Sequence, residues 1–189
     1  MTISSHSNRL INRETANWSI FTVILVLMFA APLSAQQSPP ALNWNAFKFL
    51  IGEWIGEGTG APGEGTGGFV FSYDLQSTVL VRKNYANYPA TKDRPAFRHD
   101  DLMIVYQEAG KTRATYFDNE QHVINYTVEL SKDTNAAIFL SDASPSARRF
   151  RLTYTKLGTD RVKITFDMAP PGKPDSFAAY LEGTARKKK

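Results

Sequence analysis

Six side chains able to do chemistry lie in two short stretches near the middle of the chain. They are His99, Asp100, Asp101, Asp118, Glu120 and His122. Imidazole and carboxylate groups are ligands for divalent metals and partners in acid–base catalysis. Whether the six meet depends on the strands that carry them.

Two predicted hairpins decide which of these side chains share a face. Turns at Ala109-Gly110 and Asn119-Glu120 pair three strands in sequence, and the cross-strand partners follow from alternation. The predicted inner face consists of Leu102, Ile104, Tyr106, Arg113, Thr115, Phe117, His122, Ile124, Tyr126 and Val128. His99 and Asp101 then fall on the opposite face, with His99 in solvent. We therefore predict no metal site.

The predicted inner face carries His122 near the barrel mouth and a polar group deeper inside. A buried arginine without a partner is costly, so Arg113 either belongs to a structural network or meets an anionic ligand. His122 is either a ligand-binding group or a histidine bonded to a backbone carbonyl. Our ligand-binding candidates here are Tyr106, Arg113, Thr115, His122 and Tyr126.

Other motifs do not indicate catalysis. Gly58, Gly60 and Gly63 match G-x-G-x-x-G. A dinucleotide-binding fold needs a helix directly after those glycines, but an alternating strand pattern follows here. The sequence has no serine in a nucleophile-elbow setting and no carboxylate pair on the predicted inner face. We predict no catalytic residues, and a binding protein rather than an enzyme.

Alternation with a period of two dominates the chain after Glu53 and predicts about ten strands. The runs are 53–58, 68–76, 79–88, 100–108, 111–118, 122–131, 136–142, 149–156, 161–169 and 176–186. Short connections favour an up-and-down antiparallel barrel. Alternation also predicts an apolar and aromatic inner wall, to which three strands contribute Phe69, Phe71, Tyr73 and Leu75; Phe150, Leu152 and Tyr154; and Val162, Ile164, Phe166 and Met168. The apolar residues from Leu42 to Ile51 have a helical period and predict a short N-terminal helix that closes the barrel. The expected fold is thus an all-β, antiparallel up-and-down barrel over 43–189.

The N-terminus has the pattern of a secretory signal peptide. Arg9 and Arg13 precede an apolar stretch at 20–33, which small residues follow up to Ala35. The stretch is shorter than the roughly 20 residues that span a bilayer. We predict a signal peptide over 1–35, a linker over 36–42, no membrane span after cleavage, and a periplasmic or secreted protein.

The amino-acid composition excludes some kinds of cross-link, metal site and binding partner. The chain has no cysteine, so disulfides and thiolate metal sites are excluded. Its formal net charge is +4 at pH 7, and charges of both signs are mixed along the chain. This is not a nucleic-acid-binding pattern.

The segment Gly-Glu-Trp-Ile-Gly-Glu-Gly at 52–58 resembles the entry strand of calycin barrels, in which G-x-W follows a short closing helix. The longer form is similar to nitrobindin-type haem-binding barrels and to secreted bacterial barrels of unknown function. The resemblance implies a calycin or lipocalin-like barrel with structural roles for Gly52, Trp54 and Arg186. In such barrels the tryptophan closes the base beneath a basic side chain of the last strand.

The same resemblance raises the question of whether this barrel binds haem. Nitrobindin-like barrels bind the haem iron through a histidine at the start of the final strand, in a pattern similar to His-Leu-x-Ala. This chain has Tyr180-Leu181-Glu182-Gly183 there. A tyrosine ligates ferric haem as a phenolate with a supporting arginine or histidine, and the local sequence supplies neither. Tyr180 is a ligand-binding candidate, and the cofactor is left open.

We therefore expect an exported protein that holds a small apolar or amphipathic molecule inside a β-barrel. One alternative is a nitrobindin-like haem protein acting on reactive nitrogen or oxygen species. Another is an envelope interaction module whose filled barrel binds nothing.

Overall fold

The computed structural model describes residues 44–57 and 65–189. Contacts divide the chain into two units, Met1–Pro39 and Pro40–Lys189, and every described residue belongs to the second. The predicted signal peptide and linker lie outside the described residues, as do residues 58–64 of the glycine-rich segment. Within the described part, no helix has the length and apolarity needed to cross a membrane.

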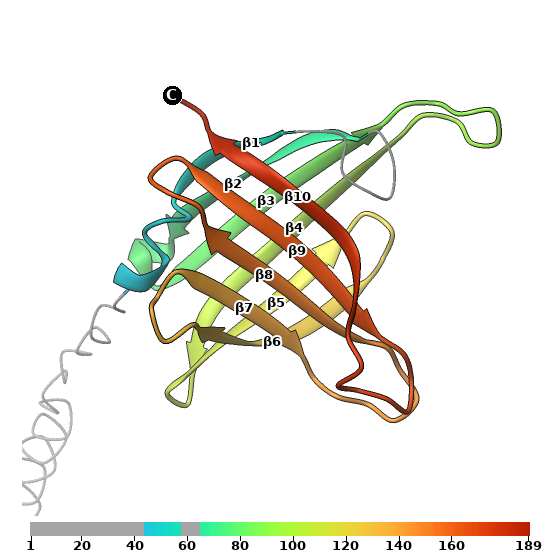
Figure 1. The fold of residues 1–189 in the computed structure, drawn as a ribbon. Helices are drawn as coiled ribbons and strands as arrows, with labels where there is room; N and C mark the ends of the chain where they lie inside the picture. Colours follow the sequence, from blue (N-terminus) through green and yellow to red (C-terminus); the bar gives the residue numbers. More distant parts are fainter. Residues whose placement is uncertain (1–43, 58–64) are drawn as a thin grey trace, which may run out of the picture. The chain divides into compact units, whose positions relative to one another are not determined.

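Ten antiparallel strands form a closed barrel, as predicted (Figure 1). Each strand pairs with its neighbour in the chain, and β1 pairs with β10. The strands are β1 (Gly52–Glu57), β2 (Thr66–Asp74), β3 (Val79–Tyr88), β4 (Phe97–Glu108), β5 (Lys111–Asp118), β6 (Val123–Leu130), β7 (Ala136–Ser141), β8 (Arg149–Lys156), β9 (Arg161–Ala169) and β10 (Ala178–Lys187). Closure pairs the strand edges that an open sheet would leave free.

The predicted closing helix is wrong, because from residue 44, where the description of the chain begins, a single 3₁₀ turn, η1 (Asn45–Phe47), precedes the barrel. The Phe47 and Leu50 amides donate to the carbonyls three residues earlier, each at 2.9 Å. A 3₁₀ turn has three residues per turn, so side chains three apart lie on one side. Trp44, Phe47 and Leu50 have this spacing and are all buried.

Trp54 joins this turn to the barrel, as predicted. Its side chain is buried, its Nε1 donates to the Leu50 carbonyl at 2.7 Å, and its ring stacks on Phe69. The basic group over the ring is Lys187, with Nζ 5.6 Å from the ring centroid, and not Arg186. Trp54 pairs directly with Lys187 across β1 and β10, so Arg186 faces outward. There Arg186 Nε lies 3.5 Å from a Glu57 carboxylate oxygen.

Gly52 has a structural role consistent with the resemblance. Its φ is +118°, and an added Cβ would lie 2.8 Å from Lys187 Cε. Any larger residue would strain the backbone and displace the lysine that covers Trp54.

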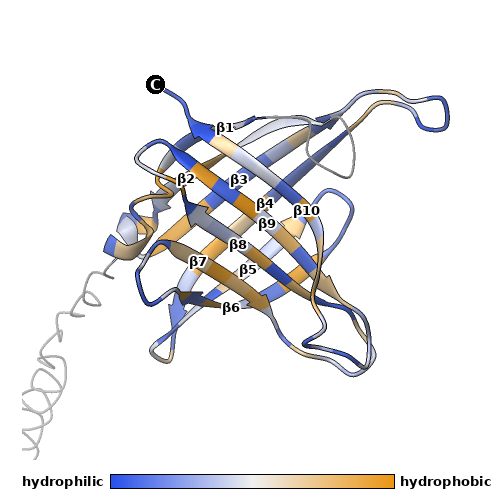
Figure 2. Cartoon of the chain, in the orientation of Figure 1, coloured by the Kyte–Doolittle hydropathy of each residue, from blue (hydrophilic) through white to orange (hydrophobic). Residues whose placement is uncertain are grey.

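Hydrophilic and hydrophobic residues alternate along several strands (Figure 2), as expected where successive side chains point alternately to the interior and to the outer surface. Several predicted inward faces are confirmed by buried or cavity-lining positions. These are Phe69 and Phe71 on β2, Phe150, Leu152 and Tyr154 on β8, and Val162, Ile164, Phe166 and Met168 on β9. Tyr73, next to the last residue of β2, and Leu75, which begins a second 3₁₀ turn, η2 (Leu75–Ser77), are exposed instead.

The register of β4 with β5 is as predicted, with Ile104 opposite Thr115, but the inward face of both strands is the other one. Met103, Val105 and Ala114 are the buried side chains. Both faces of β4 carry apolar and polar side chains in similar numbers, so alternation alone could not decide which face lies against the core. The predicted inner placement of Leu102, Ile104, Tyr106, Arg113, Thr115 and Phe117 is therefore wrong.

The turn between β5 and β6 is one residue longer than predicted. Gln121 has a φ of 71°, and the Asp118 amide donates to the His122 carbonyl at 3.3 Å. The Asp118 carboxylate also accepts hydrogen bonds from the Glu120 and His122 amides, at 3.0 and 2.9 Å. The extra residue reverses the face of β5 relative to β6. The predicted inward placement of Ile124, Tyr126 and Val128 on β6 is confirmed.

Truncation of Trp54 should destabilise the barrel. Trp54→Ala removes a fully buried ring together with its hydrogen bond and should cost about 3 to 5 kcal/mol in the free energy of unfolding. Phe117→Ala on the outer surface is a matched aromatic truncation and should cost less than about 1 kcal/mol. Urea unfolding of both variants measures this. Equal losses would show that Trp54 does not hold the closed end of the barrel.

Candidate functional site

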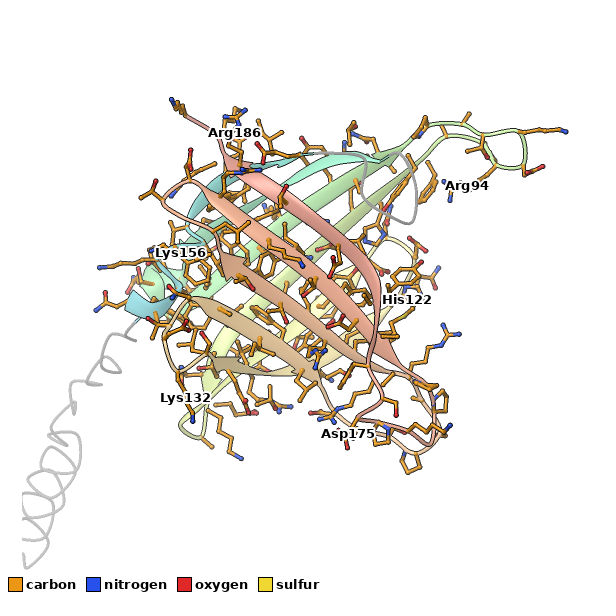
Figure 3. The ribbon with its side chains drawn as sticks, in the orientation of Figure 1. Arg94, His122, Lys132, Lys156, Asp175 and Arg186 are labelled. Atoms are coloured by element: carbon orange, nitrogen blue, oxygen red, sulfur yellow. The ribbon has the colours of Figure 1, made fainter. Side chains whose placement is uncertain are left out.

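A cavity of about 950 Å³ lies inside the end of the barrel away from η1. This is near the upper end of the range for small-molecule sites. Arg82, Tyr126 and Tyr154 form its floor, above the closed apolar core. Arg94 and His122, which Figure 3 labels, belong to the rim.

One wall of the cavity is apolar. It is formed by Phe150 and Leu152 of β8 and by Ile164, Phe166 and Met168 of β9. The rings of Phe150 and Phe166 are stacked with centroids 5.7 Å apart and planes 7° apart. This wall offers contact area and no side-chain hydrogen bond.

The opposite wall is polar and begins with a buried ion pair between β3 and β4. Arg82 donates through Nη2 to Asp101 and through Nη1 to the Tyr154 hydroxyl, and the Asn84 amide donates to Asp101 at 2.7 Å. Burial opposes the charge of Arg82, but its interactions with Tyr154 and Asp101 outweigh this and raise its pKa. Burial likewise opposes the charge of Asp101, but Arg82 and His99 lower the pKa of this carboxyl.

His99 continues the polar wall towards the rim. Its Nδ1 lies 2.7 Å from a Glu120 carboxylate oxygen, and its Nε2 lies 3.1 Å from the Tyr116 hydroxyl and 3.4 Å from Asp101. The hydrogen bond to Asp101, with a further contribution from Glu120, outweighs partial burial and raises the pKa of His99 to about 9. The imidazole is therefore cationic at neutral pH.

The hydrogen-bonded chain extends from Tyr116 to the rim. The Tyr116 hydroxyl donates to Asp118 Oδ2 at 3.1 Å, and His122 Nδ1 lies 2.9 Å from the same oxygen. Burial would raise the pKa of Asp118, but the hydrogen bonds from His122 and Tyr116 lower it. His122 itself is 64 % exposed at the cavity mouth.

The structure thus brings together five of the six side chains that the sequence singled out. The prediction that His99 lies in solvent, apart from the other stretch, is wrong, because the true inner face of β4 carries His99 and Asp101. Asp100 faces outward and pairs with Arg98 at 2.9 Å. Within 44–57 and 65–189, no group of three or more such side chains is arranged to hold a metal ion.

The predicted ligand-binding candidates separate into two groups. Tyr126, His122 and Tyr180 line the cavity, Tyr180 at the rim with its ring edge-on to Phe166. Arg113 lies on the outer surface, where it donates to Thr127 at 2.6 Å and meets Asp142 at 3.3 Å. Tyr106 and Thr115 share that outer face and do not line the cavity.

Sequence reasoning missed the buried arginine of the site. Arg82 follows two adjacent apolar residues, Leu80 and Val81, so the sequence did not show which face of β3 points inward. The signal was its two-residue spacing from Leu80, which places both on one face of a strand. Its partners Asp101 and Tyr154 are 19 and 72 residues away in the sequence, and only the barrel brings them together.

The fold and cavity place this chain among closed ten-stranded β-barrel proteins. No family model and no curated protein matches the sequence. Among solved structures, the crystal structure of Rv2717c from M. tuberculosis is similar, with a TM-score of 0.53 and 15% identity, covering 80% of this chain and 99% of that one. At this identity the likeness shows the fold alone.

The raised pKa of His99 predicts a pH dependence of stability. Its stabilising contacts should be fully present below about pH 6.5, the ordinary histidine pKa, and should be lost as the pH rises through about 9. The NMR titration of the His99 ring, assigned with His99→Gln, should have its midpoint near 9. Glu120→Gln should lower this midpoint. Urea unfolding should show that the free energy of unfolding falls over this pH range, and that the fall is smaller in His99→Gln. An NMR midpoint near the ordinary histidine pKa of 6.5 would show that His99 does not belong to the network.

Proposed function

We propose that this protein binds a small amphipathic molecule inside the barrel. The observation that supports this most is the division of the cavity into an apolar wall on β8 and β9 and a polar wall on β3 to β6. Apolar contact supplies affinity in such sites, and a few placed polar groups supply orientation. The signal-peptide pattern at 1–35 supports a role in the periplasm or outside the cell.

The buried ion pair also supports a binding role. A buried Arg–carboxylate pair is often no more stabilising than apolar residues of similar volume. A barrel that only had to be filled would gain little stability from Arg82 and Asp101 compared with apolar side chains, and the cavity above them is large. These features disfavour the alternative of a filled barrel that acts only as an interaction module.

The side chains do not fit the haem alternative well. Tyr180 stands where the resemblance implies a histidine, is 48% exposed, and has no arginine or histidine bonded to its hydroxyl within the described residues. Both ring nitrogens of His99 are engaged, and its raised pKa keeps them protonated at neutral pH. A protonated imidazole has no lone pair for iron.

Filling the cavity tests the proposal. Gly183 on β10 lines the cavity, and no heavy atom lies within 4 Å of an added Cβ. Gly183→Trp should therefore place an indole in the cavity without disturbing the wall. Fluorescence titration with the neutral probe N-phenylnaphthylamine should show saturable binding to the wild type and at least a tenfold loss in this variant.

The control is Thr165→Trp on β9, next to β10, whose side chain lies on the outer face. It adds the same indole outside the cavity and should leave probe affinity within about twofold of the wild type. Circular dichroism and thermal unfolding would verify that both variants are folded. Unchanged binding in folded Gly183→Trp would show that the probe does not enter the barrel, and the proposal would fail.

Haem titration separates the proposal from its main alternative. We expect weak uptake or none, because neither Tyr180 nor His99 is prepared to ligate iron. The Soret band measures this directly. Tight stoichiometric uptake with a histidine-type spectrum, abolished by His122→Ala, would instead favour the haem protein.

A further inference from the structure

The charges of the polar wall are already matched to one another. Arg82 pairs with Asp101, and cationic His99 bridges Asp101 and Glu120. Asp118 accepts from Tyr116, from His122 and from two backbone amides. Among the described residues, Arg94 and Arg148 line the cavity without a carboxylate partner, but both are exposed. A charged group seated near the floor would have to compete with the partners of the polar wall or remain unpaired, which is costly.

Arg82 Nε has no hydrogen-bond partner within the described residues, but this atom is fully buried and does not open onto the cavity. The hydrogen-bonding capacity that a ligand can reach at the floor belongs to neutral groups. Tyr126 is 1% exposed and lines the cavity, yet within the described residues its hydroxyl has no hydrogen-bond partner. Burial raises its pKa, so the hydroxyl keeps its proton and can donate. The Tyr154 hydroxyl accepts from Arg82, which leaves its own hydrogen unused.

These two hydroxyls lie on the floor, where the polar wall begins. Tyr126 is on β6, and Tyr154 is on β8, next to the apolar side chains of β8 and β9. A molecule seated against Phe150 and Phe166 would present one side to the apolar wall. An acceptor atom on its other side, near the floor, would meet the unpartnered hydroxyl.

We propose that the cavity selects an uncharged molecule with an apolar body and an oxygen acceptor, such as a ketone or amide carbonyl, and that Tyr126 donates the hydrogen bond that recognises it. The proposal rests on the proposed function and adds the chemical class of the ligand. It assigns Arg82 and Asp101 a positioning role, since they hold Tyr154 and the polar wall in place without meeting the ligand themselves.

Three probes of nearly the same shape test the class of ligand. They are acetylnaphthalene, naphthoate and isopropenylnaphthalene, substituted at the same ring position, which carry a neutral carbonyl, a carboxylate and no acceptor. The wild type should bind the ketone about tenfold more tightly than isopropenylnaphthalene, which lacks the acceptor, and than naphthoate, whose charge would lose its water near the floor without a partner.

Tyr126→Phe tests the assigned residue. Calorimetric titration should show about a tenfold loss for acetylnaphthalene and no more than a twofold change for isopropenylnaphthalene. Tyr106→Phe removes a hydroxyl from the outer face of β4 and is the matched control, with ketone affinity unchanged. Tightest binding of naphthoate, or equal loss of all three probes in Tyr126→Phe, would overturn the inference.

The same titrations distinguish this failure from failure of the proposed function. If all three probes bind and all are lost in Gly183→Trp, the cavity is a binding site whatever the role of Tyr126. If no probe binds the wild type, or if Gly183→Trp has no effect, the proposed function fails and the inference fails with it.

Discussion

The buried Arg82–Asp101 pair is the constraint on which the open end of the barrel depends. A guanidinium inside an apolar barrel must be matched in charge and hydrogen bonds, because removing one partner of such a pair costs about 3 to 5 kcal/mol. Asp101 provides the charge and Tyr154 provides a further acceptor from across the barrel. The pair therefore fixes the positions of β3, β4 and β8 relative to one another at the level where the core ends and the cavity begins.

The remainder of the polar wall is built outward from that pair. Asp101 attracts a protonated His99, His99 reaches Glu120, and Tyr116 connects to Asp118. Because Asp118 also accepts the backbone amides of the β5–β6 turn, the shape of that turn and the polarity of the cavity rim are parts of one network. The wall on β8 and β9 has no such network and stays apolar, which produces the two-sided cavity.

Much of the fold could be predicted because the sequence pattern is local. Alternation placed all ten strands with small boundary errors, and the paired turn at Ala109-Gly110 gave the register of β4 with β5. The site was less predictable for a specific physical reason. In β3 and β4 both faces carry apolar side chains, so the sequence does not show which face of each strand points inward. In addition, a single extra turn residue, Gln121, reverses the inward face of β5 relative to β6.

The sequence by itself determined the strand order, the burial of Trp54 beside the closing segment, and the inward faces of β6, β8 and β9. These follow from residue types and spacing within single strands or adjacent pairs. Only the tertiary structure decided that Arg82 lies inside and Arg113 outside, and that Lys187 covers Trp54 where Arg186 was expected. Those outcomes depend on which face of each strand the closed barrel turns inward, and closure is a property of all ten strands together.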